Sequence, residues 1–195
     1  NMLLLLEHRH VYTLGRRGKA SDIMVGPQEL TARGAKMYFV DRGGEVTYHG
    51  PGQLVGYPIL DLRSRGIGPV QYVRTLEELL ATTLADFGIE AQMSDKPTGV
   101  WVGNAKIAAI GVKVSRGVTT HGFALNVNPD LYYFDDIVPC GIQGGVVTSM
   151  ESVLSEEITL ERVIPSLVHH FGWAFGLRVK WYGQKELEHA IRPNA

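Results

Sequence analysis

The sequence lacks cysteine almost entirely, with Cys140 the only one in 195 residues, so it cannot form a disulfide within the chain. This excludes a disulfide-stapled secreted scaffold and a cysteine-rich zinc site. An excess of one charge is also lacking, because 19 Lys and Arg balance 20 Asp and Glu. We therefore expect no nucleic-acid partner held by bulk electrostatic attraction.

Long apolar runs are missing as well. No stretch approaches the ~18 apolar residues of a membrane span, and Leu3–Leu6 is too short for the core of a signal peptide. Internal repeats, low-complexity runs and Pro/Ser-rich linkers are absent too. We therefore expect a cytoplasmic protein with no membrane partner, and a single domain over residues 1–195.

Short apolar runs bounded by Gly, Pro or charged residues are typical of strands. They predict strands over Leu3–Glu7, Val11–Leu14, Met37–Asp41, Gln53–Leu60, Val100–Val102, Lys106–Val114, Val118–Val127 and Leu177–Trp181.

Apolar residues at helical spacing predict one helix that begins at Pro69 and stops at Gly88, and a second from Thr159 to Phe175. The turn pairs Gly103-Asn104 and Arg116-Gly117 predict an antiparallel meander between them. The fold class we expect is α+β, a two-layer arrangement with a mixed, largely antiparallel sheet flanked by helices.

Glycine is in excess, with 23 residues, and four of them fall with Pro51 between Arg42 and Gln53. Such residues bury little side chain, but they let the backbone approach a ligand and offer N–H groups to an oxyanion or a carbonyl. A glycine-rich hairpin with a solvent-facing His49 is the simpler alternative. The segment does not match a nucleotide-binding fingerprint.

Cys140 lies between Pro139 and Gly141, a setting that could present a thiol without steric shielding. A free cysteine is more often a small buried apolar residue, and a nucleophilic one needs a nearby positive charge. Lys106 and Lys113 share one predicted strand and differ in parity, so without a bulge they face opposite sides. At least one could point inward and serve as a base, although an outward lysine commonly only adds solubility.

The histidines carry a weaker signal. His121 on a predicted strand is typical of a structural group, and His169-His170 read as surface or packing residues. His8 and His10 share a strand face, but no partner with metal-ligand spacing accompanies them, so we expect no metal. The residues together indicate acyl chemistry with a thiol nucleophile, a lysine or histidine partner and a glycine-rich loop. A hydrolase and a transferase look alike at this level.

Four separated motifs occur in order: RGGEVTYHGPGQ from Arg42, KIAAIG from Lys106, HGFALN from His121 and PCGI from Pro139. Together they resemble the lipoyl(octanoyl) transferase family, LipB, over roughly residues 3–154. The resemblance implies a fold like that of biotin and lipoate protein ligases. It also implies a further N-terminal segment that this sequence lacks.

The family resemblance implies transfer of an octanoyl group from octanoyl-acyl carrier protein to a lysine on lipoyl domains, through a cysteine thioester. The acceptors are the E2 subunits of 2-oxoacid dehydrogenases and the glycine-cleavage H protein. The catalytic pair would be Cys140 and Lys106, in a monomer that needs no cofactor. The implied substrate-binding residues are Arg42, Gly43, Gly44, Glu45, Val46, Thr47, Tyr48, His49, Ala109, Ile110, Gly111, Gly122, Phe123 and Ala124.

Three alternatives remain open. An ATP-dependent lipoate or biotin ligase would share the fold and the lysine but would not need Cys140. A non-catalytic acyl-binding relative would carry an inert thiol and would leave Lys106 unexplained. A thiol hydrolase would release free octanoate at a rate that added lipoyl domain does not change.

Overall fold

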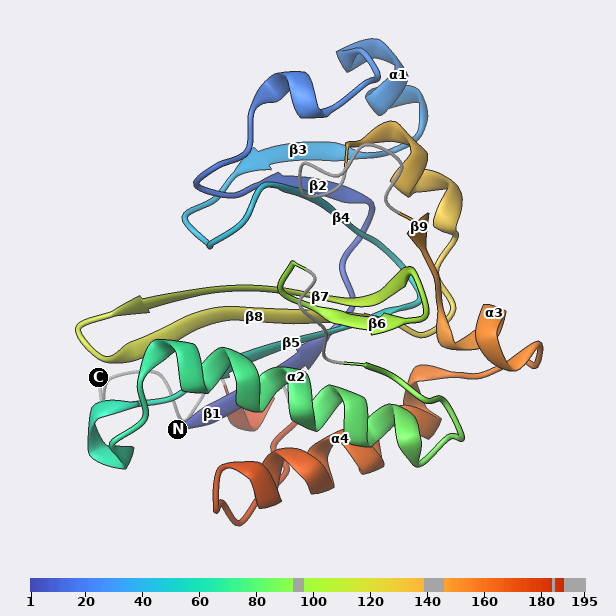
Figure 1. Cartoon of the computed structure of the whole chain (residues 1–195). Coiled ribbons are helices and arrows are strands. Elements are labelled where there is room, and N and C mark those ends of the chain that lie inside the picture. The colour runs from blue at the N-terminus through green and yellow to red at the C-terminus, as the bar shows by residue number, and fades with distance from the viewer. Residues whose placement is uncertain (93–96, 139–145, 184, 188–195) are drawn as a thin grey trace.

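Two β-sheets face each other in the computed structural model, which describes residues 1–92, 97–138, 146–183 and 185–187 (Figure 1). The larger sheet is antiparallel along its main path, and β9 (Val146–Val147) adds a parallel pairing to β7. Its strand order is β1 (Met2–Leu6), β5 (Gln53–Ile59), β8 (Val118–Asn126), β7 (Ala105–Ser115) and β6 (Val100–Val102). The smaller sheet has the order β3 (Lys36–Phe39), β2 (Val11–Leu14) and β4 (Val46–His49), with β3 parallel to β2.

Two long helices cover the face of the larger sheet that points away from the smaller one (Figure 1). Helix α2 (Pro69–Ala85) has Pro69 in its first turn, and α4 (Leu160–Ala174) tolerates Pro165 in its interior. Leucines of α2 pack with Phe171 of α4 and with Leu125 of β8 in the main core. The predicted α+β class, with a mixed, largely antiparallel sheet flanked by helices, is confirmed.

A second, smaller core lies under the three-stranded sheet. Tyr12 and Tyr48 are fully buried there with Leu30 of α1 (Pro27–Ala32) and Ile137. The remaining short elements are η1 (Ala20–Asp22), η2 (Arg63–Arg65), η3 (Leu131–Asp136) and α3 (Met150–Leu154). No helix in the described part of the chain has both the length and the apolar character needed to cross a bilayer.

The predicted meander is confirmed, because β6, β7 and β8 are consecutive antiparallel strands. Arg116 and Gly117 form the two-residue connection between β7 and β8, with φ values of 53° and 87°. Positive φ at both central positions matches the right-handed twist of the flanking strands, which is why this pair makes a tight hairpin.

The predicted strand Leu177–Trp181 is wrong, since these residues form no ladder. The N–H of Leu177 instead donates to the carbonyl of Gly172 at 2.8 Å and closes the end of α4, while Trp181 stays 61% exposed. An apolar alternating run becomes a strand only where a neighbouring edge can pair with it. Conversely, the sequence pattern predicts neither β4, which lies inside the glycine-rich segment, nor α1.

The centre of the larger sheet requires a glycine at position 56. A Cβ there would lie 2.2 Å from the ring of Phe123, which packs across Gly56 from the neighbouring strand. The missing side chain thus lets Phe123 lie flat on the sheet, where it is 2% exposed.

We expect Gly56→Ala to lower the free energy of unfolding by about 1–3 kcal/mol, because overpacking displaces the Phe123 ring. Gly68→Ser is the control, since nothing lies within 4 Å of a Cβ at this N-cap of α2; its change should stay within about 0.5 kcal/mol. Urea unfolding of the two variants and the wild type measures both. Equal stability of the two variants would contradict the packing argument.

Candidate functional site

A cavity of about 590 Å³ lies where the two sheets face each other. The larger sheet contributes residues of β5, β7 and β8 to its wall, and the smaller sheet contributes all three of its strands. The predicted site residues that line it are Arg42, Gly44, Glu45, Val46, Thr47, His49, Lys106, Ala109, Ile110, Gly111, Gly122, Phe123 and Ala124.

Two predicted substrate-binding residues are not in the cavity wall. The N–H of Gly43 donates to the carbonyl of Val112 at 2.9 Å, which ties the glycine-rich segment to β7. Tyr48 points into the smaller core, and its hydroxyl is 2.8 Å from Nδ1 of His10. Tyr48 turns away from the cavity because side chains alternate along β4, where Thr47 and His49 line the wall.

Lys106 reaches the cavity because of a β-bulge. Val100 of β6 pairs with Ala108 while Trp101 pairs with Lys106, so Ile107 is an extra residue on β7. Beyond the bulge Ala109 lines the cavity, whereas Ile107 belongs to the main core. Such a bulge shifts the alternation of side chains by one residue and places Lys106 on the same face as Ala109.

The side chain of Lys106 is largely buried, with an exposed fraction of 9% for the residue. Its Nζ lies 3.4 Å from the carbonyl oxygen of Thr98 and 4.8 Å from the centre of the Trp101 ring. A carbonyl and an aromatic face both favour a cation, so they hold the ammonium group at the cavity.

The bulge lies between Lys106 and Lys113, so it also changes which face Lys113 takes relative to Lys106. Without a bulge, the alternation of side chains predicts opposite faces for the two lysines. Lys113 forms an ion pair with Asp41, and Nε2 of His121 lies 2.8 Å from the same carboxyl group. These two contacts lower the pKa of Asp41 to about 2, with the Lys113 hydrogen bond the larger cause. Asp41 thus clamps the loop after β3 to the larger sheet.

His121 reaches the cavity through a second backbone irregularity. It pairs with Val112, which packs against the main core, so regular alternation would turn its ring towards the helices. Its φ of 60° is in the left-handed region, which is uncommon for a residue other than glycine. The ring lines the cavity instead and contacts Asp41.

Cys140, the predicted nucleophile, lies outside the described residues, as do Pro139 and Gly141. The described residues on either side of that stretch are firmly held. The N–H of Val138 donates to the carbonyl of Asp22 at 2.9 Å, and Val147 pairs with Lys106 on β7.

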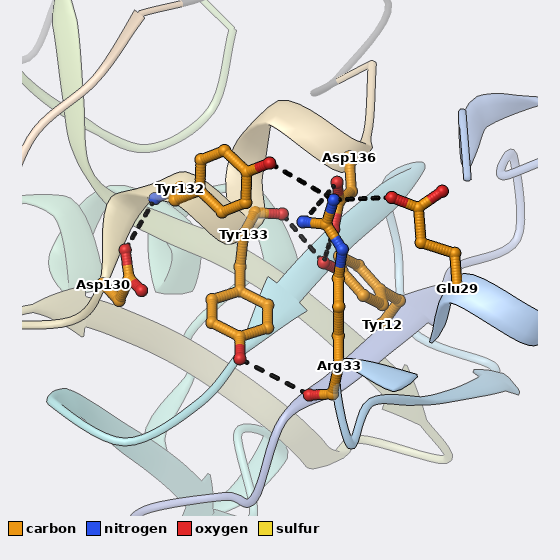
Figure 2. A network of polar contacts seen from close by, with 7 residues as sticks. All are labelled: Tyr12, Glu29, Arg33, Asp130, Tyr132, Tyr133 and Asp136. Atoms are coloured by element: carbon orange, nitrogen blue, oxygen red, sulfur yellow. Dashed lines mark hydrogen bonds and ion pairs between the residues drawn. The ribbon is translucent and has the colours of Figure 1, made fainter. Parts of the chain in front are cut away.

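A polar network anchors η3 just before that stretch (Figure 2). Asp136 is 3% exposed, and its carboxylate accepts a hydrogen bond from the Tyr12 hydroxyl at 2.7 Å. Arg33, at the end of α1, lies 3.0 Å from the same carboxylate and 2.7 Å from that of Glu29. Burial and the hydrogen bond to Asp136 both raise the pKa of Tyr12. The network fixes η3 against β2 and α1.

The guanidinium of Arg42 supports the glycine-rich segment from inside. Its Nη2 donates to the carbonyl of Thr13 at 2.6 Å, and its Nη1 donates to that of Gly43 at 3.0 Å. Arg42 is 8% exposed, so these contacts join β2 to the segment that ends in β4.

Sequence reasoning missed several polar residues of the cavity wall. His8, Arg9, His10 and Tyr57 line it, and the Nε2 of His8 lies 2.7 Å from the hydroxyl of Tyr57. Burial lowers the pKa of His8 and raises that of Tyr57. The shared strand face of His8 and His10 is the signal in the sequence that could have placed them in the wall.

His49 is the most deeply buried histidine of the wall. Burial is the main cause that lowers its pKa to about 3, and the neighbouring Arg42 lowers it further. Its imidazole is therefore neutral at physiological pH. Within the described residues no group of three His, Cys, Asp or Glu side chains could hold a metal ion, and the expectation of a metal-free site stays a prediction.

Comparison with known proteins gives consistent matches. Residues 1–172 match the family described as the lipoyl protein ligase A/B catalytic domain. An octanoyltransferase of Acidobacterium capsulatum is 53% identical over 196 residues, covering 93% of this chain and 80% of the relative. An octanoyltransferase of Koribacter versatilis is 52% identical over 184 residues, covering 92% of this chain and 73% of the relative.

Solved structures share the fold at low identity. A lipoate-protein ligase A bound with ATP superposes with a TM-score of 0.74 at 18% identity, covering 96% of this chain and 78% of the other. A biotin protein ligase of Aquifex aeolicus, in complex with biotin and ATP, superposes with a TM-score of 0.56 at 13% identity, covering 84% of this chain and 70% of the other. The predicted biotin and lipoate ligase-like fold is therefore confirmed.

The low pKa of His49 predicts a pH-dependent stability. Unfolded His49 takes up a proton below its ordinary pKa near 6.5, whereas the folded residue does so only near 3. The unfolded state therefore binds more protons between these values, and stability falls as the pH drops. From pH 7 to pH 5 the His49 contribution costs about 2 kcal/mol.

His49→Gln removes this titration, so its free energy of unfolding should fall less steeply from pH 7 to pH 5 than that of the wild type. Urea unfolding at four pH values measures, for the variant and the wild type, the slope of the free energy of unfolding against pH. Parallel slopes would show that His49 is not held neutral by burial.

Proposed function

The chain belongs to the lipoyl protein ligase A/B catalytic-domain family, and on that premise we propose that it is an octanoyltransferase acting in protein lipoylation. It takes the octanoyl group from octanoyl-acyl carrier protein and passes it to the lysine of lipoyl domains. The acceptors are E2 subunits of 2-oxoacid dehydrogenases and the glycine-cleavage H protein. We also propose that it acts in the cytoplasm, as a monomeric single domain without a cofactor.

The observation that supports this function best is a buried lysine at a cavity with a largely apolar wall. Lys106 meets Ala109, Ile110 and Ala124 in that wall. A volume of about 590 Å³ is typical of a small-molecule site, and an apolar wall suits an acyl chain. Relatives about 50% identical carry the name octanoyltransferase, which agrees with this reading.

In the first half-reaction Lys106 stabilises the thiolate of Cys140 and takes its proton. The sulfur attacks the thioester carbonyl of the donor, and the bond from that carbon to the carrier thiol breaks. The carrier thiolate leaves with the proton, and an octanoyl thioester forms on Cys140. Backbone N–H groups of the glycine-rich segment stabilise the oxyanion.

In the second half-reaction the neutral amine of the acceptor lysine attacks this thioester. The carbon–sulfur bond breaks as the carbon–nitrogen bond forms, and one amine proton passes through Lys106 to the sulfur of Cys140. A thioester is replaced by a thioester in the first step and by an amide in the second. Neither step is strongly uphill, so no ATP is needed.

A second candidate function is that of an ATP-dependent ligase, because the lipoate-protein ligase A that shares this fold is bound with ATP. An ATP-dependent ligase would activate free octanoate as an adenylate and would not need Cys140. At 18% identity the likeness supports the fold alone.

We expect wild-type protein mixed with octanoyl-acyl carrier protein to gain one octanoyl group by intact-mass analysis. Cys140→Ser should gain none under these conditions. Lys106→Met keeps the apolar stem but loses the charge, so adduct formation should slow by about 100- to 1,000-fold. An undiminished adduct on Cys140→Ser would remove the mechanism.

Lys113→Met is the matched control for Lys106→Met, because both lysines lie on β7 and form polar contacts. Its adduct formation should slow less than about tenfold, since Lys113 pairs with Asp41 and lies outside the cavity wall. Losses of equal size in both variants would show that Lys106 acts through general electrostatics.

Amide formation from free octanoate discriminates between the two functions. A transferase modifies a lipoyl domain from octanoyl-acyl carrier protein without ATP, and adding ATP with free octanoate gives no product. ATP-dependent turnover of free octanoate that survives in Cys140→Ser would instead establish a ligase.

A further inference from the structure

A chain of amide side chains runs from the backbone beside Lys106 to the ring of His49. The carbonyl of Thr148 accepts a hydrogen bond from Nδ2 of Asn126 at 2.9 Å. Asn126 Oδ1 in turn accepts from Nε2 of Gln53 at 3.0 Å. Gln53 Oε1 lies 3.2 Å from Nδ1 of His49. Gln53 is 1% exposed and Asn126 is 4% exposed, so water does not compete for these bonds.

The direction of every bond in this chain is determined by its first member. A carbonyl oxygen only accepts, so the amide nitrogen of Asn126 must face Thr148. Asn126 then presents its oxygen to Gln53, and a second carbonyl, that of Tyr48 at 3.2 Å, also requires the nitrogen of Gln53. Gln53 is thereby left with its oxygen towards His49.

The tautomer of His49 follows from this orientation. Because Gln53 Oε1 is an acceptor, Nδ1 of His49 carries the proton and donates it. A neutral imidazole has one protonated nitrogen, so Nε2 keeps an unshared lone pair. His49 lines the cavity, and within the described residues its ring makes a hydrogen bond only through Nδ1.

The surroundings keep His49 neutral. After burial, Arg42 is the largest cause that lowers the pKa of His49, and His8 and His121 lower it further. The ring of His8 lies 5.6 Å from that of His49, centre to centre. Tyr57 lies beside His8 and carries no charge at neutral pH. Nε2 is therefore a hydrogen-bond acceptor and not a proton carrier at physiological pH.

We propose that Nε2 of His49 accepts a hydrogen bond from the amine of the acceptor lysine in the second half-reaction, and that Gln53 and Asn126 are positioning residues that fix its tautomer. This inference rests on the proposed function. His49 would contact the substrate, whereas the two amides act through His49.

The charges around the cavity favour an amine as the bound group. Arg42 lines the wall and is largely buried, so an incoming ammonium group would meet a like charge in a desolvated site. Both effects favour the neutral amine, which is the nucleophilic form and still has two N–H donors. The octanoyl chain and its thioester have no N–H group to offer.

The hydrogen-bonded amides Gln53 and Asn126 lie beside Lys106, the proposed proton carrier. A small cavity of about 30 Å³ is lined by Lys106, Gln53 and Asn126 together, and it shares Thr47 with the main cavity. In the step itself the carbon–nitrogen bond forms, the carbon–sulfur bond to Cys140 breaks, and one amine proton passes through Lys106 to sulfur. The other N–H stays bonded to His49, which orients the nitrogen lone pair towards the carbonyl carbon.

Separating the half-reactions tests the proposal. In His49→Phe, formation of the octanoyl adduct from octanoyl-acyl carrier protein should stay within about threefold of the wild type. Discharge of the isolated octanoyl-enzyme by a lipoyl domain should slow by about 10- to 100-fold, as expected for one lost hydrogen bond. Gln53→Leu should show the same pattern with a smaller loss.

Thr83→Val is the matched control. Thr83 is fully buried in α2, where its hydroxyl donates to the carbonyl of Leu79, and α2 contributes no residue to the wall of either cavity. The substitution removes a buried hydrogen bond without touching Gln53, Asn126 or His49, so neither half-reaction should change. Equal slowing of both half-reactions in His49→Phe, slowing of the first alone, or no slowing would overturn the proposal.

Nitrogen-15 NMR of the histidine rings gives a readout that does not depend on activity. In the wild type, His49 should show a protonated Nδ1 and an unprotonated Nε2, and Gln53→Leu should convert this signal to a mixture of tautomers. A protonated Nε2 in the wild type would overturn the proposal that Gln53 and Asn126 fix the tautomer of His49. If no octanoyl adduct forms at all, the proposed function fails, while the NMR result still decides the tautomer.

Discussion

The arrangement of the cavity depends on one extra residue in β7. Because Ile107 is inserted opposite the bond between Val100 and Trp101, the strand presents Lys106 and Ala109 on one face and Ile107 on the other. In a regular strand Lys106 would share a face with Ile110 and Val112, against the helices. An ammonium group in that apolar core would be costly, whereas at the cavity it meets a carbonyl and an aromatic ring.

The two faces of the larger sheet consequently carry different chemistry. The helix side is a continuous apolar core that includes Leu76, Leu125 and Phe171. The opposite side holds buried polar groups, and each is oriented by another: Arg42 by Thr13, and Gln53 by Asn126. Buried polar groups of this kind are tolerable only when their hydrogen bonds are made, so the cavity wall is rigid and its donors and acceptors are fixed in place.

The sequence predicted the features that depend on local pattern. Val11–Leu14 and Val100–Val102 have the predicted bounds, and α2 begins at Pro69 as the apolar spacing and the proline indicate. Arg116-Gly117 formed the expected hairpin turn because its conformation is set within the turn itself.

The features that the sequence did not predict depend on partners distant in the chain. The bulge at Ile107 is defined by β6, and the failure of Leu177–Trp181 to form a strand reflects the lack of a pairing edge. The ring of His121 turns to the cavity through a φ value that residue type does not favour. For the site, the motifs named most of the wall, but the roles of Gln53 and Asn126 follow only from hydrogen-bond directions.

Both backbone irregularities of the meander turn a side chain from the core to the cavity. The bulge at Ile107 does so for Lys106, and the left-handed conformation does so for His121. The left-handed conformation of His121 costs on the order of 1–3 kcal/mol, which a sheet supported by a well-packed helical layer can sustain. Bulges and strained backbone conformations are over-represented at functional sites. The two distortions therefore favour, independently of any likeness to other proteins, the proposal that the functional site lies on the cavity face of β7 and β8.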